Sequence, residues 1–446
     1  MNAITATVPS QEYLSIFYVA LTATDIGKNS QIQMENLGDG TFRVTDGRTS
    51  VSVGAKKPKS YILPMSEWDS FYRNKLSTMN LPHSAVEVYT TKRKKVVQTI
   101  GVKPENDQYA READPSVDEI VRRILQYADM AMEESFTIKA DEITPEMIKR
   151  GCVWIKQLNS IYTEYELLDS EKKADKALTK SYVSKFNDAL IGLYAAVPRR
   201  IVRLNDMLAK QPKNFLNLIT DNQDLIDLAE QQATGTAVVQ AYSWTKANGI
   251  TCRPATESEK AYIVKKLTGN GCNFIQAWIF DNKKTRSNYN EFCEKHNLSR
   301  ENKGCTRLWH GTRVMNLCSI LTNGLVLDPE RFGASLCGKA YGYGTYFAPD
   351  ARKSLGYTSI QASKWANGNQ PTGLLLLYDV AVGQKETQYN GSCGCDHTLC
   401  WNKLQRIKPG AFCTWAEYRY SGFMMDEVIV YNECQDTVWA MVEVAR

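Results

Sequence analysis

Three short segments in the C-terminal part of the chain carry side chains suited to one shared chemical task. They span residues 308–313, 342–357 and 426–431. Their polar and aromatic side chains of interest are, in chain order, His310, Tyr346, Lys353, Ser354, Tyr357 and Glu427. Two tyrosine rings can hold a flat ring between them, and a carboxylate can stabilise a centre that becomes positive as a bond breaks. Each segment alone is a weak signal, but their order and spacing together are specific.

These segments resemble the His–Tyr–Glu signature of the poly(ADP-ribose) polymerases, within the diphtheria-toxin-like ADP-ribosyltransferase superfamily. The matches read W-H-G-T-R at 309–313, G-Y-G-T-Y-F-A at 342–348 with K-S-x-x-Y at 353–357, and D-E-V-I-V-Y at 426–431. The likeness extends upstream. Residues 114–235 are similar to the regulatory helical domain of the DNA-dependent members, and residues 18–48 look like their WGR domain. The whole resembles the short DNA-dependent enzymes of that family.

The resemblance implies an enzyme that consumes NAD⁺ as a substrate. The catalytic residues it implies are His310, Tyr346 and Glu427. The NAD⁺-binding residues it implies are His310, Gly311, Thr312, Tyr346, Lys353, Ser354 and Tyr357. The nicotinamide of NAD⁺ is already cationic, so its departure needs no acid and leaves an oxocarbenium-like ribose. We therefore expect orientation and a nearby negative group to supply the catalysis.

Each residue then has an expected role. Tyr346 and Tyr357 stack on the nicotinamide, and Gly311 approaches its carboxamide closely because glycine has no side chain. The Ser354 hydroxyl completes that amide recognition. His310 and Thr312 contact the adenosine ribose. Glu427 binds the nicotinamide ribose and polarises an incoming hydroxyl, and Lys353 lies near that acceptor.

Two positions depart from the family pattern. The namesake Trp-Gly-Arg is replaced by Asp46-Gly47-Arg48, so the DNA-contacting module lacks its tryptophan. The position sixteen residues after His310, often an arginine near the adenine, is Val326. Contacts to the adenosine must then come partly from elsewhere.

The elements that position these residues follow from hydrophobic patterning. Residues 12–90 predict a β-rich segment, with a strand over 41–45, a tight turn at 46–48 and a helix over 65–77 capped by Ser66. Apolar residues at three- and four-residue spacing predict four to six helices over 114–235, with start signals at Pro115, Thr144-Pro145 and Asp221. Runs at 374–382, 427–431 and 438–444 predict strands.

We therefore expect an α+β multidomain protein. A small β-rich WGR-like domain would span 8–98, an all-α regulatory bundle 114–235, and a mixed α/β ADP-ribosyltransferase domain 248–446. Charge is uneven between them: residues 40–103 hold twelve Lys or Arg against four Asp or Glu, whereas 114–235 hold sixteen against twenty. A basic N-terminal module suits contact with phosphates. It includes Arg48 and a polar linker that begins with Lys92-Arg93-Lys94-Lys95.

The twelve cysteines do not indicate a disulfide framework. They are scattered over a large chain, none precedes Cys152, and no C-x-x-C pair occurs. One segment has ligand types that suit zinc. It contains Cys393, Cys395, His397 and Cys400. Their spacing is not that of paired zinc knuckles, so we expect no metal and keep reduced thiols in a loop as the ordinary interpretation.

The sequence thus predicts an NAD⁺-dependent poly-ADP-ribosyltransferase that is stimulated by DNA breaks and acts on protein acceptors, including itself. Two alternatives stay open: transfer of a single ADP-ribose unit, and a catalytically silent scaffold that binds DNA or NAD⁺. No Rossmann fingerprint is present, because the glycines at 342 and 344 open no dinucleotide-binding helix. With no apolar run long enough to span a membrane and no secretory signal, we expect an intracellular protein without membrane partners, nuclear if eukaryotic and cytoplasmic if bacterial.

Overall fold

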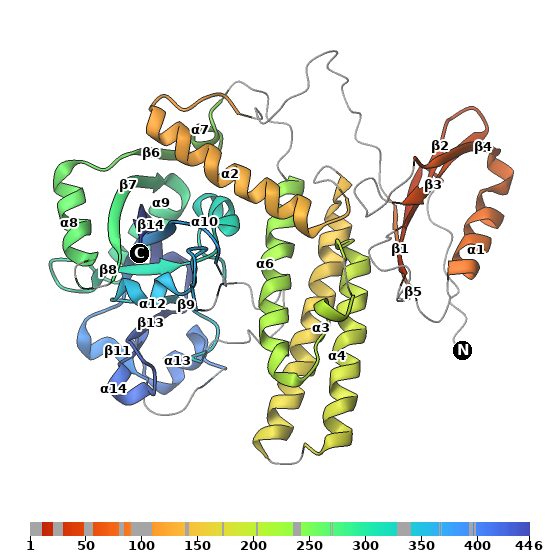
Figure 1. Ribbon diagram of the computed structural model, residues 1–446. Helices are drawn as coiled ribbons and strands as arrows, with labels where there is room; N and C mark the ends of the chain where they lie inside the picture. Colours follow the sequence, from red (N-terminus) through yellow and green to blue (C-terminus); the bar gives the residue numbers. More distant parts are fainter. Residues whose placement is uncertain are drawn as a thin grey trace. The chain divides into compact units, whose positions relative to one another are not determined.

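The computed structural model describes most of the chain as a mixed α/β protein (Figure 1). The described residues are 11–20, 30–48, 57–79, 84–90, 109–138, 142–171, 174–201, 204–234, 242–267, 269, 271–327, 340–364, 366, 368–391, 396 and 398–446. The chain divides into two compact units. The first consists mainly of Met1–Lys103 and Met130–Gly235, the second of Pro104–Asp129, Thr236–Glu330 and Ala334–Arg446.

The N-terminal part of the first unit is an antiparallel sheet of five strands in the order β4-β3-β2-β1-β5, with one α-helix. The elements are β1 (Tyr13–Ala20), β2 (Ser30–Asn36), β3 (Thr41–Arg48), β4 (Lys59–Pro64), α1 (Trp68–Met79) and β5 (Ser84–Thr90). Alternate residues of β2 and β3 are buried, and they pack on Trp68. The turn between β2 and β3 contains Gly38 and Gly40, both at positive φ, as its glycine-rich sequence predicts.

Two local predictions in this segment are wrong. Asp46, Gly47 and Arg48 do not form a tight turn but continue β3, where Asp46 lies opposite Ile32 of β2. Gly47 serves a close approach instead: a Cβ built there would lie 2.9 Å from the Cα of Pro58. Pairing on both sides of β3 thus overrides the local turn propensity.

Ser66 does not cap the predicted helix. It lies inside a 3₁₀ turn, Met65–Glu67, that leads directly into α1. The residue before that turn is Pro64, which has no side chain able to accept a hydrogen bond.

The helical segment contains α2 (Pro115–Ser135), α3 (Pro145–Ser170), α4 (Lys176–Ala196), α5 (Leu204–Met207) and α6 (Phe215–Thr234). Thr144 and Asp175 cap α3 and α4 by accepting backbone hydrogen bonds. The predicted start at Asp221 is wrong: α6 already begins at Phe215, because a 3₁₀ turn at Pro212–Asn214 precedes it. The helix α2 is shared, since its residues up to Asp129 group with the second unit.

The second unit holds two sheets, in the orders β6-β7-β14-β10-β8 and β11-β12-β13-β9. Their strands are β6 (Ile250–Pro254), β7 (Asn273–Asn282), β8 (Cys305–Gly311), β9 (Thr345–Phe347), β10 (Gly373–Ala381), β11 (Gln388–Asn390), β12 (Cys413–Ala416), β13 (Glu427–Val430) and β14 (Asp436–Ala445). The helices are α7 (Trp244–Ala247), α8 (Glu257–Leu267), α9 (Lys283–Lys295), α10 (Leu317–Asn323), α12 (Ala351–Leu355), α13 (Trp401–Ile407) and α14 (Tyr418–Ser421).

The strands β10, β13 and β14 fulfil the predictions made from the three apolar runs. Every residue of β10 is buried, which is why its sequence reads as a continuous apolar run rather than an alternation. The glycines at 342 and 344 lead into β9 and not into a helix, as predicted. Among the described residues, no helix is long and apolar enough to cross a membrane.

Candidate active site

The edge strand β8 and the short strand β9 meet at His310. The Nδ1 atom of His310 lies 3.0 Å from the carbonyl oxygen of Tyr346, within hydrogen-bond distance. Backbone hydrogen bonds between Trp309 and Ala348, 2.8 Å in each direction, join the two strands beside this contact. The His310 ring also packs edge-on against Phe347 at a centroid distance of 5.9 Å. Two segments that are far apart in the sequence therefore hold the histidine in one orientation.

Gly311 lies directly against the helix α12. A Cβ built at Gly311 would be 1.8 Å from the carbonyl oxygen of Ser354, so no other residue fits. Ser354 is itself buried at 4% exposure. Asp350 begins α12 by accepting a hydrogen bond from the Arg352 backbone N–H. The structure thus places Gly311 and Ser354 side by side, as the sequence-based assignment to one carboxamide site requires.

Glu427 is the first residue of β13 and lies almost fully out of water, at 6% exposure. Its Oε1 atom forms an ion pair with Nζ of Lys353, which comes from α12. Burial raises the pKa of the Glu427 carboxyl above its ordinary value, and the Lys353 ammonium opposes that rise. Among the described residues, the Lys353 ammonium is the cation that pairs with this buried carboxylate.

The two tyrosines are held differently. The Tyr346 hydroxyl accepts a hydrogen bond from the Tyr341 backbone N–H at 2.9 Å and donates to the Gly342 carbonyl at 3.3 Å. Tyr357 is partly exposed, at 39%. Burial of its hydroxyl, together with the negative charge of Glu427, raises the pKa of Tyr357 to about 12. Tyr357 thus stays neutral over the physiological range.

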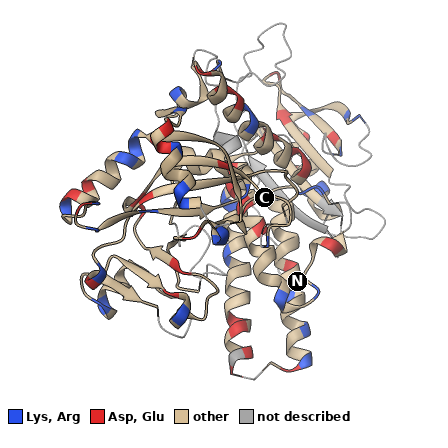
Figure 2. Cartoon of the chain, turned by 60° about the vertical axis from the view of Figure 1, so that its left-hand side comes forward, with Lys and Arg blue, Asp and Glu red and all other residues tan. Residues whose placement is uncertain are grey.

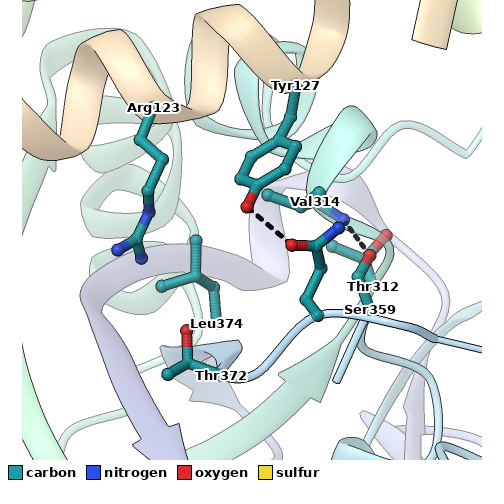
Figure 3. Close-up of a pocket in the computed structure, with 8 residues that line it drawn as sticks. Arg123, Tyr127, Thr312, Val314, Ser359, Thr372 and Leu374 are labelled. Atoms are coloured by element: carbon teal, nitrogen blue, oxygen red, sulfur yellow. Dashed lines mark hydrogen bonds between the residues drawn. The ribbon is translucent and has the colours of Figure 1, made fainter. Parts of the chain in front are cut away.

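Thr312 lines a small cavity beneath α2 (Figure 3). Its hydroxyl accepts a hydrogen bond from the Asn316 side-chain amide at 3.2 Å. From α2, Arg123 and Tyr127 point into the same cavity, and the Tyr127 hydroxyl donates to Gln370 at 2.7 Å. The cavity measures about 20 Å³, room for one water molecule.

The contribution of α2 to this cavity was not foreseen from the sequence. Arg123 and Tyr127 belong to an ordinary amphipathic helix, and nothing in their spacing singles them out. Arg123 also forms an ion pair of 2.8 Å with Glu443, a buried carboxylate of β14. The one signal in the sequence is Glu443 itself, a carboxylate within the apolar run 438–444. If that run forms a buried strand, a cation must approach it.

Of the four residues considered for zinc, only Cys400 lies within the described residues. The prediction that this segment holds no metal therefore stays a prediction. Val326, which stands where the family often has an arginine, is 55% exposed.

Comparison with known proteins gives a match within the second unit. The model of the poly(ADP-ribose) polymerase catalytic domain matches residues 264–411. This stretch of the chain is therefore similar to that catalytic domain. That match contains His310, Tyr346 and Tyr357, whereas Glu427 lies beyond its end.

Similar poly(ADP-ribose) polymerases come from distant organisms. Human poly [ADP-ribose] polymerase 2 is 44% identical over 77 residues, which is 17% of this chain and 12% of that protein. Poly [ADP-ribose] polymerase 1 of Oryza sativa is 38% identical over 148 residues, 29% of this chain and 14% of that protein. The same-named protein of Gallus gallus is 28% identical over 145 residues, 30% and 13% respectively. The matched stretches thus span only about an eighth of the length of these relatives.

Proposed function

We propose that this protein is an NAD⁺-dependent poly-ADP-ribosyltransferase, which transfers ADP-ribose to proteins, itself included, and elongates the chain with release of nicotinamide. The observation that carries the proposal is the buried Glu427–Lys353 pair beside Tyr357, in the same unit as the matched catalytic domain. The segments 8–98, 114–235 and 248–446 are proposed as WGR-like, regulatory and catalytic domains.

In this proposal Glu427 acts on the bond between nicotinamide and ribose. A carboxylate taken out of water exerts a stronger field on a developing oxocarbenium centre than an exposed one, because water does not screen it. Tyr357, neutral and exposed, supplies one face of the nicotinamide pocket, and Tyr346 the other. Gly311 and Ser354 together bind the carboxamide, and His310 orients the adenosine ribose with Thr312.

The ion pair with Lys353 also prepares Glu427 to bind the hydroxyl group of an incoming acceptor. The ammonium favours the ionised form of Glu427, whereas burial favours the neutral form. An ionised Glu427 can accept a hydrogen bond from an incoming ribose hydroxyl and polarise it, which chain growth needs. Lys353 would then lie beside that acceptor.

DNA with breaks is proposed as the activating partner, and α2 as the part that restrains the site. NAD⁺ placed against Thr312 meets Arg123 and Tyr127, since the cavity there admits only one water. The adenosine portion therefore requires α2 to move. Charges of both signs are interspersed along the described elements in the view of Figure 2, and the basic run 92–95 lies outside the described residues. Phosphate contacts by that run remain the proposed link to DNA.

One automodification assay tests the proposal. The protein is incubated with labelled NAD⁺, with and without nicked DNA, and the products are separated on a gel. A ladder that depends on NAD⁺ and grows with DNA is expected. A single band would show that the enzyme transfers one ADP-ribose unit and forms no polymer. Background NAD⁺ turnover under both conditions would show that the protein is a binding scaffold.

A further inference from the structure

Asp436 is a buried carboxyl group that the proposed reaction does not use. It is the first residue of β14, lies opposite Val380 of β10, and is 3% exposed. Among the described residues, its side chain accepts a hydrogen bond from the hydroxyl of Thr345, at 3.1 Å. Thr345 is also buried and begins β9. The contact therefore joins the central sheet to the strand that carries Tyr346.

That contact leads in two steps to the active site. Thr345 is followed directly by Tyr346, whose carbonyl oxygen lies 3.0 Å from Nδ1 of His310. Behind them, the rings of His310, Phe347 and Tyr378 pack on one another, with Phe347 and Tyr378 at a centroid distance of 5.2 Å. The three residues of β9 pair with β13, and the side chain of Thr345 adds this contact to Asp436.

The surroundings of Asp436 favour its neutral form. Among the described residues, no lysine, arginine or histidine forms an ion pair with Asp436. Burial, and then the negative charge of Glu433, raises the pKa of Asp436 to about 8, although the hydrogen bond from Thr345 opposes the rise.

The other titratable groups nearby do not supply a countercharge. From β10, Tyr378 is buried, and its hydroxyl has no hydrogen-bond partner among the described residues. From α9, Arg286 is engaged by Asp281 and Asp379. Cys434, on the turn before β14, has a raised pKa, first from its own burial and then from negative neighbours that include Asp436. The His310 ring packs edge-on against Tyr378, and its Nδ1 atom lies 3.0 Å from the Tyr346 carbonyl oxygen.

We propose that Asp436 is a positioning residue: it holds Thr345 and thereby fixes Tyr346 and the carbonyl that orients His310. This inference rests on the proposed function for its effect on catalysis. When Asp436 releases its proton to solvent, a buried carboxylate without a paired cation remains. Water entry or movement of β9 lowers the free-energy cost of burying that charge. The site then loses the orientation of Tyr346 and His310 together.

Asp436→Asn tests the proposal, because the amide keeps the shape and accepts the same hydrogen bond but cannot ionise. In the full-length enzyme, kcat/KM is expected to fall about tenfold per pH unit above the pKa of Asp436. The Asp436→Asn variant is expected to keep its activity at pH 7 and to lose this alkaline fall. Glu257→Gln makes the same chemical change on a side chain that is 90% exposed, and should leave the alkaline fall in place.

Thr345→Val is a second test, in which the alkaline fall should move rather than disappear. Without the hydroxyl, the ionised form loses the hydrogen bond that stabilises it, so the alkaline fall should move to higher pH. The same variant should have a lower kcat/KM at pH 7, because β9 has lost its anchor. An alkaline fall that is identical in Asp436→Asn and the unmodified enzyme, or one unmoved in Thr345→Val, overturns the proposal.

Two measurements work without any transferase activity. The native state binds one proton more than the unfolded state between the unfolded pKa of an aspartate and the raised pKa of Asp436, so Tm should fall with rising pH across that range. Asp436→Asn should lack this part of the fall. At pH 9, amide hydrogen exchange of residues 345–348 should be faster in the unmodified protein than in Asp436→Asn. If both differences appear while no transfer occurs at any pH, the proposed function fails and the role of Asp436 stands.

Discussion

The ammonium group of Lys353 forms an ion pair with the carboxylate of Glu427, and both side chains are largely buried, at 13% and 8% exposure. The two residues come from α12 and β13, which are 74 positions apart in the chain. A buried ion pair leaves a costly unpaired charge when one partner is removed. The predictions that follow use this pair and its neighbours.

Glu427→Gln is expected to abolish chain growth while it leaves NAD⁺ binding largely intact. The amide keeps the shape of the side chain but removes the charge aimed at the oxocarbenium centre, which typically costs on the order of 10²–10³ in rate. A product gel gives the chain lengths, and calorimetry gives the affinity for NAD⁺. Glu257→Gln is the matched control. Polymers of ordinary length from Glu427→Gln would remove Glu427 from the catalytic set.

Lys353→Met should move the acid side of the pH profile to higher pH. Burial already raises the pKa of Glu427, and Lys353 is the group that opposes this rise. Without the ammonium, the pKa of Glu427 should rise further, because an adjacent opposite charge is lost. Because the carboxylate is the active form, activity is lost as the pH falls through that pKa. Initial rates measured from pH 5 to 8 check the shift.

A suitable control for this pH series is Lys403→Met. Lys403 pairs with Asp396, both partly exposed, so its loss should leave the profile unchanged. Equal profiles for Lys353→Met and the unmodified enzyme would show that Glu427 does not depend on Lys353.

Gly311→Ala is expected to inactivate the enzyme and lower its Tm. The new methyl group would overlap the Ser354 carbonyl oxygen, so β8 and α12 must move apart at the proposed carboxamide site. Gly410→Ala serves for comparison: it has open space but a φ of +78°, and should cost about 1–2 kcal/mol of stability without loss of activity. Benzamide affinity of the folded variants, measured by calorimetry, separates the two effects. Unchanged affinity in Gly311→Ala would contradict the assignment.

Tyr357→Ala should raise the KM for NAD⁺ and weaken the binding of benzamide. Loss of one stacking face costs roughly 1–3 kcal/mol, or about 5- to 150-fold in affinity. Tyr357→Phe keeps the ring and should bind almost normally. If both variants bind benzamide like the unmodified enzyme, Tyr357 does not line the nicotinamide pocket.

The double variant Arg123→Ala/Tyr127→Phe should raise NAD⁺ turnover in the absence of DNA. It removes the ion pair with Glu443 and the hydrogen bond to Gln370, two polar contacts between α2 and the rest of the second unit beside the cavity at Thr312. Gln126→Ala changes an exposed residue of the same helix and should have no effect. Basal turnover that stays unchanged would mean that α2 does not restrain the site.

A deletion can locate the restraint within the helical segment. Residues 115–129 group with the catalytic unit, whereas 130–235 belong to the first unit. Removal of 114–235 should give DNA-independent turnover. Removal of 130–235 alone leaves Arg123 and Tyr127 in place, so turnover without DNA should stay low. Stimulation of the intact protein by DNA should fall steeply with salt, because phosphate contacts release counterions.

The sequence by itself determined the elements whose signals are local. The apolar runs that became β10, β13 and β14 could be read directly, because buried strands need continuous apolar side chains. The helical periodicity over 114–235 was equally readable. The motif residues were identified by their order along the chain, and the family model covers the histidine and both tyrosines.

Only the tertiary structure decided what depends on residues distant in sequence. Strand pairing drew Asp46 into β3, although its local sequence is typical of a turn. The close approach of Gly311 to Ser354 and the burial of Asp436 against Thr345 have no local signature, since each depends on which strands and helices become neighbours. A side chain's charge state and its partner follow from burial, and burial is a property of the packed chain as a whole.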